Sequence, residues 1–247
     1  MRWLLYPVKC LLAGFVAMQI FFALQIALWI GLDPSSTAFQ RAERWRLCSW
    51  HWSCSMQSQW VPYDKISNNL KRAVLVSEDD IFFQHSGVRI EDMQKAWQKN
   101  QQQNQQKTQA GNKSKTALRG GSTITQQLAK NLFLSSEQNY LRKGQELIIT
   151  GLLELTLSKQ RLYEIYLNSV EWGEGIFGVG AASQHYYATS PASLDRDQAA
   201  ALASALPAPK CFDRQQYCRR GSINYSARQE FILEGMDRVA LAPYPKK

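Results

Sequence analysis

The sequence contains few strand signals and no internal repeat, which argues against an all-β domain and a repeat architecture and predicts a mainly α-helical chain. It also lacks a recognised nucleic-acid-binding signature, so no nucleic acid is expected as a partner. No grouping of carboxylates and histidines has the composition of an all-protein metal cage. The chain has five cysteines but no CxxC pair, which disfavours a structural zinc site. We therefore expect no metal site built by the protein alone.

Residues 11–32 contain no charged side chain. About 20 apolar residues of helix are enough to cross a bilayer, whereas the apolar part of a cleaved signal peptide is shorter, about 7–15 residues. Residues 11–32 are therefore predicted to be a retained transmembrane anchor, preceded by a cytoplasmic N-terminus at residues 1–10. Arg2 and Lys9 favour this orientation, although arginines on the other flank weaken the asymmetry.

The cysteines provide a second indication of where the domain lies. Cys48 and Cys54 are close in sequence, as are Cys211 and Cys218, while Cys10 lies at the membrane boundary. Two local disulfides suit an oxidising compartment, and a zinc site made of the same four thiolates is the alternative. We favour disulfides, which places the folded domain outside the cytoplasm.

The remaining length is enough for one domain with a hydrophobic core, which we place at residues 61–247. Residues 33–60 are rich in Trp, Arg and Ser without clear periodicity and are predicted to be a juxtamembrane linker. Residues 88–119 are predicted to be a mobile, membrane-proximal loop, because residues 100–118 are polar and basic without an acid. The net charge of +9 suits membrane lipids with anionic headgroups, or phosphates.

Residues 120–134, GGSTITQQLAKNLFL, are the most informative segment. Thr123 and Gln126 have the spacing of a reciprocal capping box at the start of a helix. The apolar stripe of that helix consists of Ile124, Leu128 and Leu132, and the face turned away from the core of Gln127, Lys130 and Asn131. A solvated polar face is the ordinary interpretation. Amides and a lysine also suit an anionic, sugar-bearing ligand.

Two other segments carry carboxylates. In residues 77–87, SEDDIFFQHSG, Glu78 lies among three acids before an aromatic pair, where burial can raise the pKa of a carboxyl towards that of a general base. A solvated turn is the alternative, and His85 alone is more often structural. In residues 142–146, RKGQE, Glu146 lies one helical turn beyond two cations, which is either a surface pair or a fixed carboxylate at a cleft.

Residues 173–178, GEGIFG, match the dinucleotide-binding fingerprint in letters only. That motif must follow a strand and open a helix within a βαβ unit, and the preceding residues have helical spacing instead. We discount a dinucleotide site.

Together, five segments in order resemble the peptidoglycan glycosyltransferase family, specifically its monofunctional, membrane-anchored members. They are SEDDIFFQHSG, GGSTITQQLAKNLFL, RKGQE, KQRLYEIYLNSVEWGEGIFGVGAASQHYY and QAAALASALPAPK. The resemblance implies a lysozyme-like helical domain with a small membrane-associated subdomain at residues 88–119. It also implies a bacterial inner-membrane protein with its catalytic domain in the periplasm.

The resemblance further implies the reaction. Lipid II is polymerised into linear β-1,4 glycan strands by inverting glycosyl transfer, with release of undecaprenyl diphosphate. Glu78 is implied to be the general base, Glu146 the second carboxylate and Lys130 a ligand of the diphosphate. Further residues expected at the substrate are His85, Ser122, Thr123, Gln126, Gln127, Asn131, Arg142, Lys143 and Asn168.

No tightly bound cofactor is expected, although a divalent cation such as Mg can accompany the substrate diphosphate. The expected partners are lipid II, the growing glycan chain, membrane lipids, and penicillin-binding and cell-division proteins. Two positions depart from the family pattern, since Gln138 replaces a common arginine and Arg89 a common aspartate. These departures keep open a non-catalytic scaffold of the wall-synthesis machinery, while Glu78 as a general acid would suit a lysozyme-like glycan-cleaving enzyme. The polar face around Lys130 favours the glycosyltransferase, because a hydrolase has no diphosphate to bind.

Overall fold

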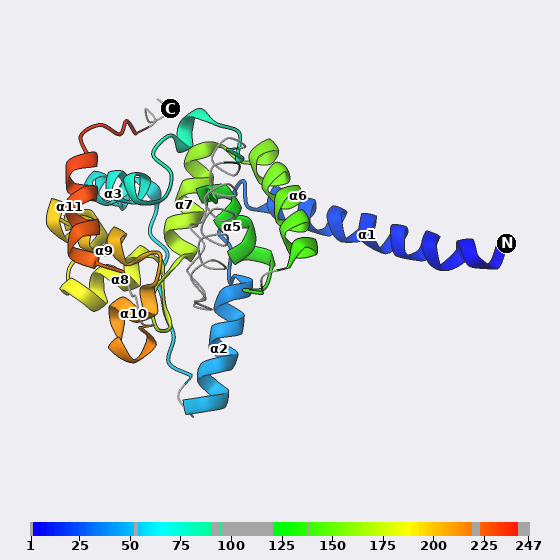
Figure 1. Ribbon diagram of the computed structural model, residues 1–247, viewed down its shortest axis with the longest axis horizontal. Helices are drawn as coiled ribbons and strands as arrows, with labels where there is room; N and C mark the ends of the chain where they lie inside the picture. Colours follow the sequence, from blue (N-terminus) through cyan, green and yellow to red (C-terminus); the bar gives the residue numbers. More distant parts are fainter. Residues whose placement is uncertain are drawn as a thin grey trace, which may run out of the picture.

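A computed structural model of the chain describes residues 2–51, 54–89, 94, 121–137, 139–218 and 223–241. These residues are mainly helical, which confirms the predicted fold class (Figure 1). The helices are α1 (Arg2–Leu28), α2 (Ala38–His51), α3 (Asn68–Glu78), α5 (Ile124–Phe133), α6 (Tyr140–Thr156), α7 (Lys159–Ser169), α8 (Gly178–Tyr187), α9 (Arg196–Ala205), α10 (Pro209–Asp213) and α11 (Tyr225–Gly235). Short 3-10 turns are η1 (Tyr63–Lys65), η2 (Phe82–Gln84), η3 (Pro191–Ser193) and η4 (Gln215–Tyr217). Most of the loop predicted at residues 88–119, and Gln138, lie outside the described residues.

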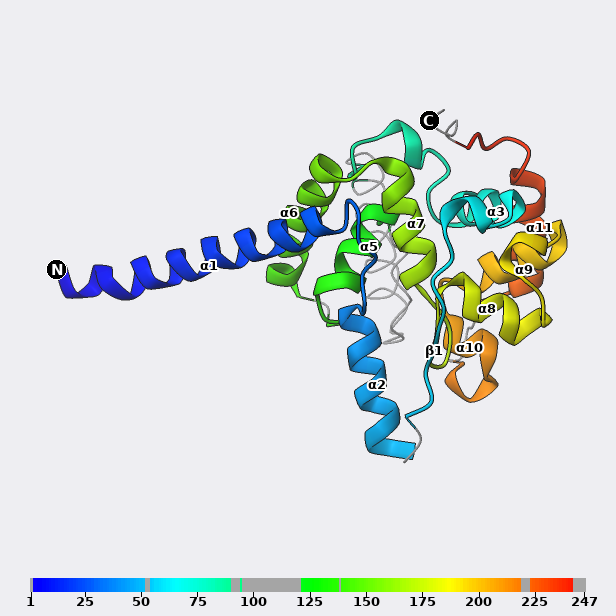
Figure 2. The ribbon, with the colours of Figure 1, turned by 180° about the vertical axis from the view of Figure 1, so that it is seen from behind.

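Helix α1 projects away from the rest of the molecule, which packs around its C-terminal end (Figures 1 and 2). Its segment Tyr6–Leu28 is long and apolar enough to cross a membrane. The predicted span was residues 11–32, but the helix begins nearer the N-terminus, at Arg2. It ends at Leu28, and residues 29–32 form turns. Arg161 of α7 donates hydrogen bonds to the carbonyl oxygens of Trp29 (2.8 Å) and Leu32 (2.7 Å) in those turns.

The prediction of a linker at residues 33–60 is wrong, because this segment contains α2. Thr37 and Gln40 cap the helix reciprocally, with the Thr37 amide donating to the Gln40 side chain (2.8 Å) and the Gln40 amide to the Thr37 hydroxyl (3.0 Å). Helix α2 packs against α5, and its Leu47 is buried. The folded part of the chain therefore begins before residue 61.

Two groups of helices build the core. Helices α3, α9 and α11 pack together at one end, while α5 packs against α6 and α7 at the other (Figure 2). Alanines of α9 are fully buried, which lets α3 and α11 approach closely. Helices α6 and α7 are separate, because α6 ends at Thr156 and Ser158 caps the start of α7.

A small sheet of order β1-β3-β2 joins the two ends, from strands β1 (Gln57–Ser58), β2 (Glu171–Gly173) and β3 (Ile176–Phe177). Strands β2 and β3 are an antiparallel hairpin, and β1 pairs with β3 in parallel. The GEGIFG segment thus forms a hairpin, in keeping with our rejection of a dinucleotide site. Gly178 has φ 78°, and a Cβ there would lie 2.6 Å from the Asn168 carbonyl oxygen, so this corner requires glycine.

Two disulfides, Cys48–Cys54 and Cys211–Cys218, confirm the preferred interpretation of the cysteines, and Cys10 is free. Each bridge closes a short loop, one after α2 and one from α10 to η4. Such bridges persist in oxidising compartments.

Candidate active site

The end of α3 presents the acidic segment to the start of α5. Asp79 is 2% exposed and accepts hydrogen bonds from the backbone amide of Ile124 (3.1 Å) and from His85 Nε2 (2.9 Å). The amide of Ile124 belongs to the first turn of α5, where backbone donors lack partners within the helix. Asp79 therefore joins the first two predicted motifs, and the carboxylate that precedes it, Glu78, is held beside α5.

His85 supports the contact that Asp79 makes between the end of α3 and the start of α5. Its Nδ1 accepts a hydrogen bond from the Gly87 amide (3.0 Å), so Nε2 carries the proton that is donated to Asp79. The Gly87 carbonyl in turn accepts from the Thr123 hydroxyl (2.5 Å). Both ring nitrogens of His85 are used within the protein, which favours a positioning role over the predicted substrate contact.

The capping box of α5 is confirmed, with Thr123 as the N-cap and Gln126 reaching back to its amide (3.0 Å). The predicted apolar stripe of α5 is buried as well. Gln126 itself is fully buried, so its side chain holds the helix start rather than lying on an open face. Thr123 is also buried, and both residues shape the site through the backbone that they fix.

Gln127 links the first motif to α7. Its Nε2 donates to Glu78 Oε2 (2.9 Å), while its Oε1 accepts from the hydroxyl of Tyr166 (3.1 Å). Tyr166 is fully buried, so the amide is held in one orientation. The predicted polar face of α5 thus contacts the predicted base directly.

Glu78 is a largely buried carboxylate, with 12% of its side chain exposed. Burial raises the pKa of its side chain, and hydrogen bonds from Gln127 and Ser77 and the charge of Arg228 oppose that rise. The Ser77 hydroxyl lies 2.8 Å from Glu78 Oε1. A carboxylate with a raised pKa that is still hydrogen-bonded in its ionised form is suited to accept a proton.

Arg228 was missed by the sequence analysis. It lies on α11, and its Nη2 contacts the Ser77 hydroxyl (2.9 Å) and Glu78 Oε1 (3.3 Å). The two residues that meet are 150 positions apart. Nothing in the local pattern of residues 225–235 distinguishes this arginine from a surface cation, so its role emerges only from the packing of α11 on α3.

Glu146 on α6 is held by the two cations that precede it. Arg142 Nη1 lies 2.6 Å from its Oε2, and Lys143 Nζ binds its Oε1. The Lys143 ammonium also lies 3.4 Å from the hydroxyl of Ser122, at the entry to α5. The side chain of Glu146 is only 3% exposed, so this is a fixed, nearly buried carboxylate and not a surface pair.

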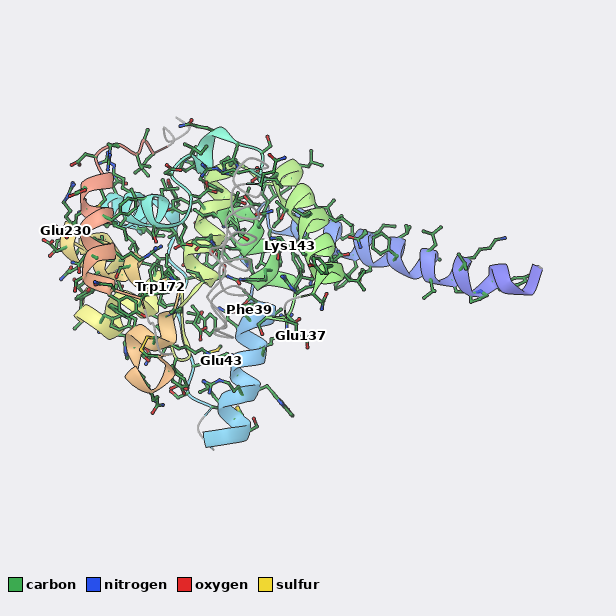
Figure 3. The ribbon with its side chains drawn as sticks, in the orientation of Figure 1. Phe39, Glu43, Glu137, Lys143, Trp172 and Glu230 are labelled. Atoms are coloured by element: carbon green, nitrogen blue, oxygen red, sulfur yellow. A yellow bond between two sulfur atoms is a disulfide. The ribbon has the colours of Figure 1, made fainter. Side chains whose placement is uncertain are left out.

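The ammonium of Lys130 interacts with the charge of both carboxylates, Glu146 and Glu78. Burial lowers the pKa of its ammonium, the charges of Arg142 and Lys143 lower it further, and those of Glu146 and Glu78 oppose this. Within the described part of the chain, its one specific contact is with the ring of Phe39 of α2, 5.5 Å from the ring centre. Figure 3 shows Phe39 on α2 and Lys143 on α6, two helices that pack against α5. An ammonium with no protein oxygen as its partner is suited to bind an anion.

Two predicted substrate residues occupy other positions. Asn168 is 3% exposed, and its amide accepts from the Val61 amide (2.8 Å) and donates to the Val61 (2.9 Å) and Glu164 (2.9 Å) carbonyl oxygens. Its geometry thus fits a structural residue that fastens residue 61 to α7. Asn131, predicted on the face turned away from the core, is 7% exposed, on the helix that α2 covers.

The site therefore combines a hydrogen-bonded carboxylate with a raised pKa, a second fixed carboxylate and an ammonium that interacts with the charge of both and has no oxygen partner among the described residues. A carboxylate that can accept a proton and a cation that can stabilise developing negative charge, set in a helical domain, fit a group-transfer enzyme. In the described residues, no group of three or more His, Cys, Asp and Glu side chains is placed to hold a metal ion.

Comparison with known proteins agrees with this class. The family model "Transglycosylase" matches residues 50–237. The chain is 58% identical to the biosynthetic peptidoglycan transglycosylase of Cupriavidus metallidurans, covering 98% of this chain and 99% of the relative. It is 55% identical to that of Cupriavidus pinatubonensis, over 98% and 92%, and 50% identical to that of Ralstonia nicotianae, over 98% and 99%.

The chain belongs to the biosynthetic peptidoglycan transglycosylase family, whose domain has a lysozyme-like helical fold. It is a glycosyltransferase of cell wall synthesis. Its one apolar helix long enough to span a membrane, among the described residues, is consistent with a single-pass anchor of such an enzyme.

Proposed function

We propose that the protein polymerises lipid II into linear β-1,4 glycan strands by inverting transfer, with release of undecaprenyl diphosphate. Glu78 takes the proton of the acceptor 4-hydroxyl as its oxygen attacks the anomeric carbon of the donor. The bond from that carbon to the phosphate oxygen breaks, and the diphosphate leaves with the electron pair. The raised pKa of Glu78 and its fixed orientation by Gln127 support this role.

The observation that carries the proposal is the ammonium of Lys130, whose charge interacts with both Glu78 and Glu146. Its Nζ has no oxygen partner among the residues described. An anion that replaces water at this ammonium gains a charge-assisted interaction in a partly buried setting. A diphosphate leaving group is such an anion, whereas a plain glycan substrate offers none.

Glu146 is proposed to keep the cationic side of the site in place. Because it binds Arg142 and Lys143 together, it fixes both cations, and the Lys143 ammonium lies at the entry of α5 beside Ser122. These cations and Lys130 can stabilise the charge that develops on the leaving diphosphate. A divalent ion such as Mg carried in by the diphosphate remains a proposal, with no protein ligand assigned to it.

We also propose that α1 places the site beside a membrane, with the catalytic domain in the periplasm. Leu141, Ile148 and Leu155 are exposed at seven-residue spacing along α6, which packs against α1. This line of exposed apolar side chains suits contact with lipid. The disulfides support a location on the oxidising side of the membrane. In this position, a donor with a polyprenyl tail in the bilayer would stay within reach of the site. Penicillin-binding and cell-division proteins remain proposed partners.

The test is polymerisation of purified lipid II by the full-length protein in detergent, beside Glu78→Gln and Lys130→Gln, with products separated by size. The proposal expects polymer from the wild type, none from Glu78→Gln, and a raised KM with Lys130→Gln. Polymer from Glu78→Gln would remove Glu78 as the base. Shortening of preformed glycan strands without polymerisation would favour a glycan-cleaving enzyme. Substrate binding without any product from a folded wild type would favour the scaffold.

A further inference from the structure

Arg228 contacts the candidate base from an element outside the recognised motifs. One nitrogen, Nη2, lies 3.1 Å from the Ser77 carbonyl oxygen, 2.9 Å from the Ser77 hydroxyl and 3.3 Å from Glu78 Oε1. The Arg228 side chain is 30% exposed and that of Glu78 12%. This charged contact is thus partly shielded from solvent, and it connects α11 to the last turn of α3.

The two oxygens of Glu78 are unequally occupied. Oε1 faces two donors, Arg228 and the Ser77 hydroxyl (2.8 Å), whose single proton is shared with the Ala203 carbonyl oxygen (3.0 Å). Among the described residues, Oε2 accepts only from Gln127 (2.9 Å). An ionised carboxylate has about two acceptor sites on each oxygen. Oε1 is therefore the more occupied oxygen, and Oε2 retains one free acceptor site among the described contacts.

We propose that Arg228 is a positioning residue for the base: together with Ser77 it occupies Oε1 of Glu78 and leaves Oε2 to take the proton of the attacking hydroxyl. This inference rests on the proposed function of Glu78. In the step, the oxygen–hydrogen bond of the acceptor breaks, a hydrogen–Oε2 bond forms, and the freed electron pair attacks the anomeric carbon. The donors on Oε1 need not move, because the proton arrives on the other oxygen.

The charge of Arg228 also keeps the base ionised. It lowers the pKa of the Glu78 side chain, against the rise caused by burial. The other charged or titratable groups that interact with Glu78 are Lys130 of α5 and Tyr163 and Tyr166 of α7. Both tyrosines are buried with raised pKa values, so they stay neutral near pH 7. Arg228 is the cation in direct contact.

Arg196 provides a matched control. It lies on α9 and donates to the Leu233 carbonyl oxygen (2.7 Å) and to Asp237 (2.7 Å), at the other end of α11. Like Arg228, it ties α11 to a neighbouring helix, but it has no contact with Glu78. Loss of α11 packing should therefore affect both arginine variants, whereas loss of the contact with the base should affect Arg228 alone.

The experiment measures kcat and KM for polymerisation of the lipid-linked disaccharide-peptide from about pH 5 to pH 9, using full-length Arg228→Gln, Arg228→Lys, Arg196→Gln and Ser77→Ala. An opposite charge within about 4–6 Å lowers a carboxyl pKa by about one unit or more. We expect the acidic midpoint of kcat to move up by about one pH unit in Arg228→Gln, with about tenfold lower kcat below it and KM unchanged. Arg228→Lys should restore part of the shift, and Ser77→Ala should move the midpoint in the same direction.

An unchanged midpoint in folded Arg228→Gln, or an equal shift in Arg196→Gln, would overturn the inference. If Arg228→Gln does not fold, unchanged midpoints in Arg228→Lys and Ser77→Ala would overturn it instead. Failure of the proposed function would give a different result, because Glu78→Gln would then retain activity. An inactive Glu78→Gln beside an Arg228→Gln profile like that of the wild type rejects only the role of Arg228.

Discussion

Replacing Gln127 with Met removes the amide that bridges Glu78 and Tyr166 while keeping a side chain of similar length. Tyr166 is fully buried, and Gln127 Oε1 is the one acceptor that its hydroxyl has among the described residues. A buried hydroxyl left without a partner costs about 1–3 kcal/mol. For a chain of this size, a loss of about 2 kcal/mol lowers Tm by about 4–8 °C.

The same variant should change the base. Gln127 donates a hydrogen bond to Glu78 that opposes the burial-induced rise in the pKa of its carboxyl group. Without it, Glu78 is protonated at higher pH, and a protonated carboxyl cannot accept the proton of the acceptor. The acidic limb of kcat should therefore move to higher pH, which a pH series of the polymerisation rate measures.

A second substitution separates the two effects. Adding Tyr166→Phe to Gln127→Met removes the stranded hydroxyl, and replacing both partners of a hydrogen bond by apolar groups is nearly neutral. The double variant should regain most of the lost Tm, while its shifted pH profile should stay as in the single variant, because Glu78 still lacks its donor. A double variant no more stable than Gln127→Met would refute the reasoning that the Tyr166 hydroxyl carries the cost.

Two further predictions concern stability. Gly87→Ala should destabilise the protein by about 1–2 kcal/mol or more, because Gly87 has φ 82° and a Cβ there would lie 2.7 Å from Glu154 Cγ. The control is Gly151→Ala, inside α6, where a Cβ would have nothing within 4 Å, and it should stabilise the protein by about 0.5–1 kcal/mol. Equal midpoints of urea unfolding for the two variants would contradict this prediction. Burial raises the pKa of Glu171 from 4.5 to about 7, so wild-type stability should fall as pH rises through that range by at most roughly 3 kcal/mol. Glu171→Gln should abolish that slope, and a pH-independent difference between the two proteins would count against it.

The parts of the site that the sequence predicted are those within one helical turn. Thr123 with Gln126, and Glu146 with its two preceding cations, meet because residues three and four apart share a helix face. Their spacing alone therefore predicted their contacts. Glu78 was singled out by its acidic and aromatic neighbours and by resemblance, and its role as the base stays a prediction, which its contact with Gln127 supports.

What could not be predicted depends on packing between distant segments. Asn168 and Val61 are 107 residues apart in the sequence, and Arg228 and Glu78 are 150 residues apart. No local sequence pattern therefore predicts either contact. Helix α2 is a different case, since Thr37 and Gln40 already have the spacing of a capping box. Its mixed Trp and Arg content hides the apolar stripe that usually identifies a helix, and the signal at the cap was overlooked.

The anchor helix α1 packs against α6, the helix that carries the cations of the site. This contact bears on how the enzyme would meet a lipid-linked donor. Gln145 of α6 exchanges two hydrogen bonds with Gln19 of α1, at 2.9 and 3.1 Å, and its neighbour Glu146 holds Arg142 and Lys143. A pair of amides in an apolar setting fixes register, because each would otherwise lack a partner. The depth of α1 in a bilayer therefore sets the depth of α6 and of its cations. On the proposed function, these cations would meet the diphosphate near the membrane surface, without requiring the polyprenyl chain to leave the bilayer.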